Sequence, residues 1–233
     1  MKTILLSGGV KPIFSSCINC NTELQNRLYD SIFYPNLLVM LSAFIVLALI
    51  VWSMGSLSIK RYNVTLPHEA NRTWLNPVPL STIAMVLGIG IGGFLDGILF
   101  HQILQWHGML TNKIPATNLI DKSVNMVWDG VFHLFTLCIV MTGIILLWKL
   151  YKRNDVNTSG NLLSGGIIAG WGLFNIVEGI INHHLIKLHN VREATIDPDI
   201  WNYGFLLSSL IILVVGLYII KKHKPERLQQ YNS

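Results

Sequence analysis

Charged residues are scarce in this sequence: Asp, Glu, Lys and Arg make up 12% of its 233 residues, while 52% are hydrophobic. A soluble domain usually carries about 25% charged residues, so the chain has too little charge to cover a water-facing surface. Its three cysteines are too few for a disulfide scaffold, and its apolar content excludes a disordered chain. The composition therefore excludes an ordinary soluble enzyme and indicates a multi-pass membrane protein.

Apolar runs long enough to cross about 30 Å of hydrocarbon occur five times. They cover residues 36–59, 80–106, 124–150, 162–188 and 201–220. Backbone groups in lipid are satisfied only within helices or closed barrels, and continuous runs of this length are typical of helices. The sequence therefore predicts an all-α, polytopic membrane protein with about five transmembrane helices, four of which form a tandem two-helix repeat bundle.

The predicted helices divide the chain into four parts: an N-terminal tail (1–35), an added first transmembrane helix (36–59), a four-helix repeat domain (80–220) and a basic cytoplasmic tail (221–233). The first residues are too weakly apolar for a signal peptide, so we expect the helix over 36–59 to be an uncleaved anchor. Lysines and arginines favour the cytoplasmic side. Ten of the lysines and arginines lie on the same side as the C-terminal tail, and seven lie on the side of the N-terminal tail. This distribution predicts an external N-terminus and a cytoplasmic C-terminus. The net charge of +5 thus reflects topology and predicts no nucleic-acid partner.

An internal repeat relates the second and fourth helices. When the sequence is aligned with itself so that Gly88 meets Gly170, Gly88–His107 lies on Gly170–His189 with six identities, and Asp96 lies on Glu178. The third and fifth helices match more weakly, through Trp128 with Trp201 and Phe132 with Phe205. Two units of two helices each are therefore expected, and membrane repeats tend to place their sites at the repeat interface.

Ionisable residues gather in and beside three of these helices. Six of the eight histidines and three carboxylates lie there: Asp96, His101, His107, Asp129, His133, Glu178, His183, His184 and His189. Such groups cost at least about 2.5–3.5 kcal/mol each in a membrane and usually face a bundle interior. With a helical rise of about 1.5 Å per residue, they converge on one layer in the outer leaflet. We interpret all nine as candidate metal ligands or their partners, although His107, His184 and His189 fit an interfacial position equally well.

The spacing within each helix suggests how a site is shared. Asp96 and His101 are five residues apart, as are Glu178 and His183, which is about 140° around an α-helix. Each pair is thus expected to flank a central site from two directions. Imidazole and carboxylate ligands suit iron, zinc, manganese or copper(II), so a metal ion is the predicted cofactor, with iron, copper and zinc not distinguished. A haem held by His101 and His183 is the alternative.

The cysteines fall into two groups. Cys138 lies in the middle of a predicted helix and is interpreted as a small packing residue. Cys17 and Cys20 form a CINC motif in the tail, which is typical of a disulfide or of half a metal knuckle. The residue after it is Asn21, where covalent haem attachment requires histidine.

Three longer motifs carry a family resemblance: GGFLDGILFHQILQWH, WDGVFH and NIVEGIINHH. In these, the chain resembles the bacterial family of predicted integral membrane proteins called domain of unknown function 2243, over about residues 80–220. The resemblance implies a multi-pass protein of the bacterial inner membrane, and it implies no specific activity.

Three functions are compatible with these residues. The first is a membrane metalloprotein, either a metal-dependent oxidoreductase or a protein of respiratory metal-centre assembly, with respiratory-chain or metal-delivery proteins as partners besides the lipid bilayer. The second is a proton or ion relay, or a transporter, built from the same groups. The third is a structural or interaction subunit whose polar cluster locks the bundle. The near absence of ionisable groups from the inner halves of the helices disfavours conduction.

Overall fold

Helices make up all the regular structure of the described residues. The computed structural model describes residues 22–29, 33–65, 77–152 and 159–223. Within these ranges it describes the side chains of all residues except 55, 57–65 and 77–79. Its elements are α1 (Thr22–Leu28), α2 (Phe33–Thr65), α3 (Pro77–Asp96), η2 (Gly97–Ile103), α4 (Leu119–Tyr151), α5 (Gly160–Glu178), η3 (Gly179–Leu185) and α6 (Pro198–Lys222). The elements η2 and η3 are π-helical turns that continue α3 and α5.

Five helical stretches are long and apolar enough to cross a membrane. They are Phe33–Met54, Leu80–Ile103, Leu119–Tyr151, Gly160–Leu185 and Pro198–Lys222. The predicted all-α, polytopic membrane fold is confirmed. The main difference lies at the ends of the second and fourth segments, which leave helical structure before His107 and His189.

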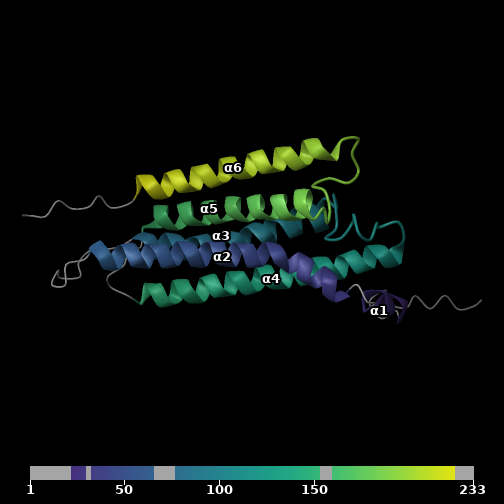
Figure 1. Ribbon diagram of the computed structural model, residues 1–233, viewed down its shortest axis with the longest axis horizontal. Helices are drawn as coiled ribbons and strands as arrows, with labels where there is room; N and C mark the ends of the chain where they lie inside the picture. Colours follow the sequence, from purple (N-terminus) through teal and green to yellow (C-terminus); the bar gives the residue numbers. More distant parts are fainter. Residues whose placement is uncertain (1–21, 30–32, 66–76, 153–158, 224–233) are drawn as a thin grey trace, which may run out of the picture.

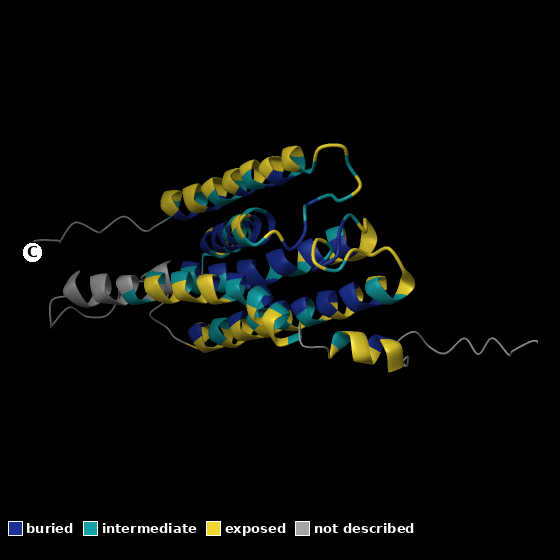
Figure 2. Cartoon of the chain, turned by 45° about the vertical axis from the view of Figure 1, so that its right-hand side comes forward, coloured by how far each residue is buried: buried dark blue, intermediate teal, exposed yellow. Residues whose placement is uncertain are grey.

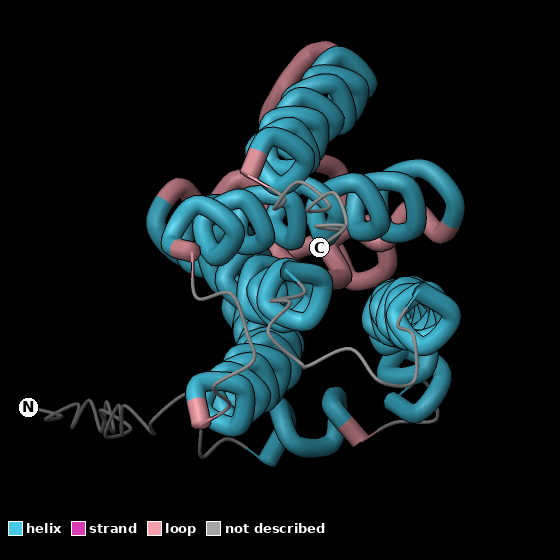
Figure 3. The backbone as a smooth tube through the Cα atoms, turned by 90° about the vertical axis from the view of Figure 1, so that its left-hand side faces the viewer, coloured by secondary structure: helices cyan, strands magenta, loops and turns pink. Residues whose placement is uncertain are grey.

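The helices form a bundle (Figure 3), and Figure 1 shows α3 and α5 between α6 and α4. More than half of the most apolar window of each central span is buried (56%), against 17% for the other three spans. Helix α4 packs on α3 and α6 packs on α5. The outward faces of α4 and α6 are largely exposed (Figure 2) and carry large apolar side chains such as Leu134, Ile144 and Leu210. This apolar outer surface is suited to contact with lipid acyl chains.

Helix α2 contributes to the same core. Its residues Met40, Ala43 and Leu47 are almost fully buried, and the ring of Phe44 lies 5.6 Å from that of Phe132 on α4. The helix that the sequence marks as an added anchor is therefore packed against the repeat bundle in this structure.

Glycines bring the two central helices into backbone contact. A Cβ atom on Gly88 would collide with the backbone carbonyl of Ile167, and a Cβ atom on Gly170 would collide with that of Met85. The alignment that lays Gly88 on Gly170 also lays Met85 on Ile167, so the two contacts are equivalent. Small residues allow such close helix packing in membranes, and here the two repeats make the same contact in both directions.

Helices α4 and α6 are related by a second alignment of the sequence with itself, the one that matches Trp128 with Trp201. Gly90 packs against Val140 and Thr136 of α4. The equivalent Gly172 packs against Leu213 and Ser209 of α6, the residues that this alignment predicts. The structure thus supports the tandem two-helix repeat that the sequence predicts.

The contact between α3 and α5 generates a first prediction. Gly88→Ala is expected to lower the free energy of unfolding by about 1–3 kcal/mol, because overpacking displaces backbone that cannot move aside. The measurement is the unfolding transition in mixed detergent, followed by circular dichroism. Gly130→Ala on α4 is the matched control, since a Cβ atom there meets nothing within 4 Å. Equal stability of the two variants would contradict the packing described.

Candidate metal centre

Two π-helical turns bring each acidic residue next to the histidine that follows it. The backbone N–H of Leu104 donates to the carbonyl of Leu99, and that of Ile186 donates to Ile181, both at 2.8 Å. Each bond spans five residues, the pattern of a π-helix, and such turns are frequent at functional sites.

The extra residue per turn places side chains five apart on the same face of the helix. His101 Nε2 lies 3.4 Å from Asp96 Oδ2, and His183 Nε2 lies 3.2 Å from Glu178 Oε1. The expectation that each pair flanks the site from two directions is therefore wrong. It assumed α-helical geometry over 97–103 and 179–185, where the backbone is π-helical.

Left-handed residues then turn the chain back under the helix ends. Gln105 has a φ of 49° and the equivalent Lys187 a φ of 53°. After these turns His107 and His189 lie buried at the end of the bundle. Both histidines belong to loops, and the turns explain how they come to face residues on η2 and η3.

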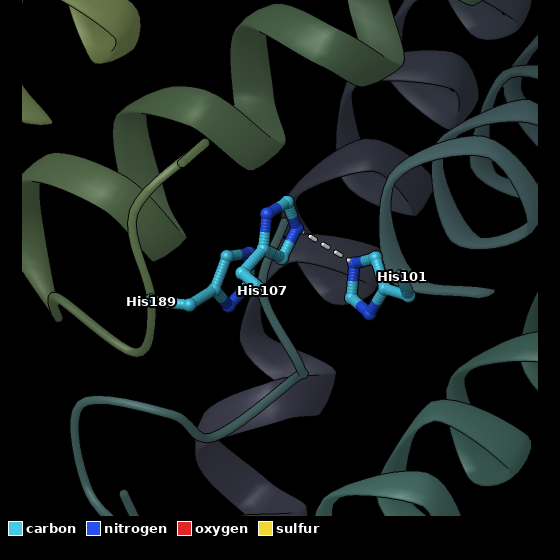
Figure 4. Close-up of side chains that lie close together, drawn as sticks. All are labelled: His101, His107 and His189. Atoms are coloured by element: carbon cyan, nitrogen blue, oxygen red, sulfur yellow. Dashed lines mark hydrogen bonds between the residues drawn. The ribbon is translucent and has the colours of Figure 1, made fainter. Parts of the chain in front are cut away.

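The two loops exchange hydrogen bonds through these histidines. The Nδ1–H of His107 donates to the carbonyl of Val191 at 2.7 Å, and that of His189 donates to the carbonyl of Met109 at 2.9 Å. Met109 and Val191 are themselves equivalent in the two repeats. The two rings are stacked, with centroids 4.4 Å apart and planes 9° from parallel, and Figure 4 shows them beside His101.

Asp129 connects α4 to both η2 and the loop after it. Its Oδ1 atom accepts hydrogen bonds from His101 Nδ1 and from the backbone N–H of Met109, both at 2.8 Å. In the second repeat, Oδ1 of Asn202 accepts the N–H of Val191 at 2.9 Å. Sequence reasoning missed Asn202, although the alignment of Trp128 with Trp201 also lays Asp129 on Asn202.

These bonds determine which nitrogen atoms face the centre. Carbonyl and carboxylate oxygens only accept hydrogen bonds, so Nδ1 carries the proton in His101, His107 and His189. A neutral ring then presents a lone pair at Nε2, whereas a ring with a second proton donates from Nε2. The Nε2 atoms of His101 and His107 are 2.9 Å apart (Figure 4), and that of His189 is 3.2 Å from Glu178 Oε1. Each of these close contacts therefore requires a positive charge between the two atoms, supplied by a second proton on an imidazole or by a bound cation.

Two overlapping groups of side chains have the spacing of metal ligands. The ligand atoms of His101, His107 and His189 lie within 4.8 Å of one another, as do those of Glu178, His183 and His189. All five residues are buried. Burial lowers the pKa of His107 well below its ordinary value. Its imidazole is thus neutral, as a metal ligand requires.

A known protein family matches most of the helical part of the chain. The family described as "Predicted membrane protein (DUF2243)" matches residues 83–223, which is more than half of the sequence. The chain belongs to this family. No curated protein and no solved structure matches it.

The part of the chain that matches DUF2243 contains all nine histidines and carboxylates that the sequence singles out. Seven of them form one buried cluster in the structure: Asp96, His101, His107, Asp129, Glu178, His183 and His189. The DUF2243 region therefore supplies the whole candidate centre.

Two of the predicted residues lie outside this cluster. His133 donates through Nδ1 to the carbonyl of Asp129, one turn earlier in its own helix. His184 packs against the ring of Tyr203 on α6, with ring centroids 5.0 Å apart. The cysteines contribute no ligand among the described residues: Cys138 is exposed on α4, so it is not a packing residue, and the CINC motif lies outside the residues described.

Polar atoms without a hydrogen bond gather in the second DUF2243 repeat. Nδ1 of His183, Oε2 of Glu178 and Oδ1 of Asn182 are buried and form no hydrogen bond within the described part of the chain, and Nε2 of His183 has only the contact with Glu178 Oε1 at 3.2 Å. In the first repeat, by contrast, Asp129 holds the ring of His101. A buried polar group left without a hydrogen bond costs about 1–3 kcal/mol, so this half of the cluster has unused capacity to bind a ligand.

The loop contacts generate a second prediction. Asn202→Leu keeps a similar shape and leaves the buried N–H of Val191 without its acceptor, which is expected to cost about 1–3 kcal/mol in unfolding free energy. Detergent unfolding measures the loss. Ser208→Ala on the same helix removes a partly buried hydroxyl that donates to the carbonyl of Phe205 in the same helix, and it is the control. A stability of the Asn202 variant equal to that of the control would contradict the assigned hydrogen bond.

Proposed function

We propose that this protein is a membrane metalloprotein whose histidine and carboxylate cluster binds a divalent transition-metal ion. The observation that carries the proposal is the orientation of three buried imidazoles. His101, His107 and His189 each donate through Nδ1 to an oxygen acceptor and turn Nε2 toward the cluster. A metal-binding histidine typically has its other ring nitrogen held in this way.

The chemistry of the donor set supports a borderline metal. Four imidazoles and three carboxylates meet without a thiolate among the described residues. This set suits zinc, iron, manganese or copper(II), and it does not favour copper(I). The negative charge of the carboxylates favours a cation within the cluster, because unpaired ions are costly inside a membrane protein.

The position between the repeats also supports a functional centre. His101 and His107 come from the first unit, while Glu178, His183 and His189 come from the second. Sites in repeated membrane folds tend to lie at such interfaces. We place the centre at the external side of a bacterial inner membrane, with the N-terminus outside and the C-terminus in the cytoplasm, on the lysine and arginine distribution.

A metal in this cluster would serve one of two related roles. As an enzyme, the protein would be a metal-dependent oxidoreductase in which the ion activates oxygen or water. As an assembly factor, it would hold a metal for a respiratory complex, with respiratory-chain or metal-delivery proteins as its partners. A proton relay has less support, because Asp96 and Glu178 are the ionisable residues of α3 and α5 and both stand at the ends of those helices.

The test is the metal content and visible spectrum of the intact protein purified in mild detergent. About one or two equivalents of zinc, iron or copper without a Soret band would support the proposal. A Soret band would replace it with the haem alternative at His101 and His183. No metal after supplementation with each ion in turn would contradict it and favour the relay or a structural subunit.

Removal of one imidazole from each repeat generates a third prediction. His101→Ala and His183→Ala should each lose bound metal, because each histidine belongs to one of the two ligand groups. Elemental analysis of the purified variants measures the loss, and circular dichroism checks that the helices persist. Cys138→Ala, at an exposed site on α4, should keep its metal. Full metal content in both histidine variants would contradict the shared site.

Asp129 generates a fourth prediction. Asp129→Asn keeps an oxygen that accepts the N–H of Met109 but removes the charged acceptor of His101 Nδ1. Loss of such an outer partner typically lowers metal affinity about 10–100-fold, and a competition titration with a zinc chelator measures it. Asp121→Asn, a change of the same type at an exposed helix N-terminus, is the control. An unchanged zinc affinity would show that Asp129 does not orient His101 for metal.

A further inference from the structure

An apolar groove lies on the outer surface of the bundle, next to the candidate centre. It is a cavity of about 390 Å³ between η2, the loop after it and α6. Half of its lining residues are aromatic: Phe100, Trp106, Trp201 and Phe205. The only hydroxyl in the lining, on Ser208, donates to the carbonyl of Phe205 in its own helix. The groove is therefore shaped for a hydrocarbon chain and offers it no strong polar contact.

Arg192 packs against the two tryptophans of this groove. The guanidinium of Arg192 lies 4.8 Å from the ring centroid of Trp201 and 5.3 Å from that of Trp106. No carboxylate among the described residues pairs with it. The adjacent Glu193 instead accepts hydrogen bonds from Thr111 and from the N–H of Asn190. Arg192 is thus held against the faces of the two tryptophan rings, and its N–H groups have no anionic partner within the described ranges.

The place of Arg192 in the chain corresponds to the lipid headgroup level. It lies in the loop that joins η3 to α6, just beyond the ends of two predicted membrane spans. Tryptophan rings prefer this interfacial depth. A guanidinium binds phosphate through two parallel hydrogen bonds, so a phosphate at this level would supply the missing anion.

We propose that the groove is a specific binding site for one anionic phospholipid. The phosphate pairs with Arg192, and an acyl chain lies along the four aromatic rings. The negatively charged headgroup thus contacts a positive side chain, and the hydrocarbon chain contacts apolar rings. A zwitterionic lipid fits the groove equally well, but its headgroup has no net charge and is therefore attracted less strongly to Arg192.

The bound lipid would be separated from the histidine cluster by one layer of side chains. Phe100 stacks on His107 with ring centroids 6.4 Å apart, and Phe205 lies 5.4 Å from His183. The lipid therefore touches neither candidate ligand. Its binding requires no metal, so this proposal stands or fails independently of the proposed metal function.

Native mass spectrometry of the full-length, delipidated protein tests the site. The protein in detergent is titrated with phosphatidylglycerol and, separately, with phosphatidylcholine of the same acyl chains. One tightly bound phosphatidylglycerol is expected. Arg192→Gln should weaken it by about fivefold, since one basic residue near a membrane surface contributes about 1 kcal/mol. Lys152→Gln is the matched control, because Lys152 also lies over a tryptophan, Trp148, and neither residue lines this groove.

A second variant fills the groove while leaving Arg192 in place. Gly204 lines the groove, and a Cβ atom there meets nothing within 4 Å. Gly204→Leu should therefore fold normally and abolish the tight lipid. The same change at Gly130, which also faces open space on α4, should leave lipid binding unchanged. Circular dichroism and the melting temperature check that both variants are folded.

Each other outcome overturns the proposal. Equal affinity for the two lipids, or an Arg192→Gln variant that binds like the wild type, would remove the charge recognition. Complete displacement of the lipid by inorganic phosphate would indicate a simple phosphate site without the acyl chain. A dimer mass that disappears in Gly204→Leu would assign the groove to a second copy of this chain.

Discussion

The backbone contact between α3 and α5 determines how close all the groups of the candidate centre come to one another. Gly88 and Gly170 let each helix rest on a carbonyl of the other. Any larger side chain at these positions would separate the helices and, with them, the histidines carried at their ends. The small residues in the middle of the bundle and the ionisable residues at its end are therefore parts of one arrangement, repeated twice along the chain.

The π-helical turns convert this close packing into a site. They follow directly after Asp96 and Glu178, and they place His101 and His183 over those carboxylates. The left-handed residues Gln105 and Lys187 then fold the loops back, so that two further histidines exchange bonds with the opposite loop. The resulting cluster brings carboxylates and imidazoles into close contact, so it requires positive charge, from protons on the imidazoles or from a bound cation.

Much of this could be predicted from the sequence because it depends on composition and repetition. Low charge and five long apolar runs predict the helical membrane fold. The alignment of Gly88–His107 with Gly170–His189 predicts the equivalence of Asp96 with Glu178 and of His101 with His183. The same repeat also aligns His107 with His189, although an interfacial position fitted these two histidines equally well from the sequence.

The helix geometry at the site could not be predicted in the same way. Spacing rules assume about 3.6 residues per turn, and a π-helical turn over 97–103 moves His101 to the face that carries Asp96. The same rules placed His133 with Asp129 but could not show that its ring bonds to its own helix backbone. Asn202 carries no charge and gives no sign of its role until Asp129 is seen in the equivalent position. Local backbone geometry and unequal halves of a repeat are decided by packing.

X-ray absorption spectroscopy of the zinc-loaded, purified protein tests the central claim most directly. We expect a tightly bound zinc ion with at least three imidazole nitrogens at about 2.0–2.1 Å and the multiple-scattering pattern of histidine. A first shell of oxygen ligands alone, or no bound zinc after loading, would contradict the assignment of this cluster as a metal centre.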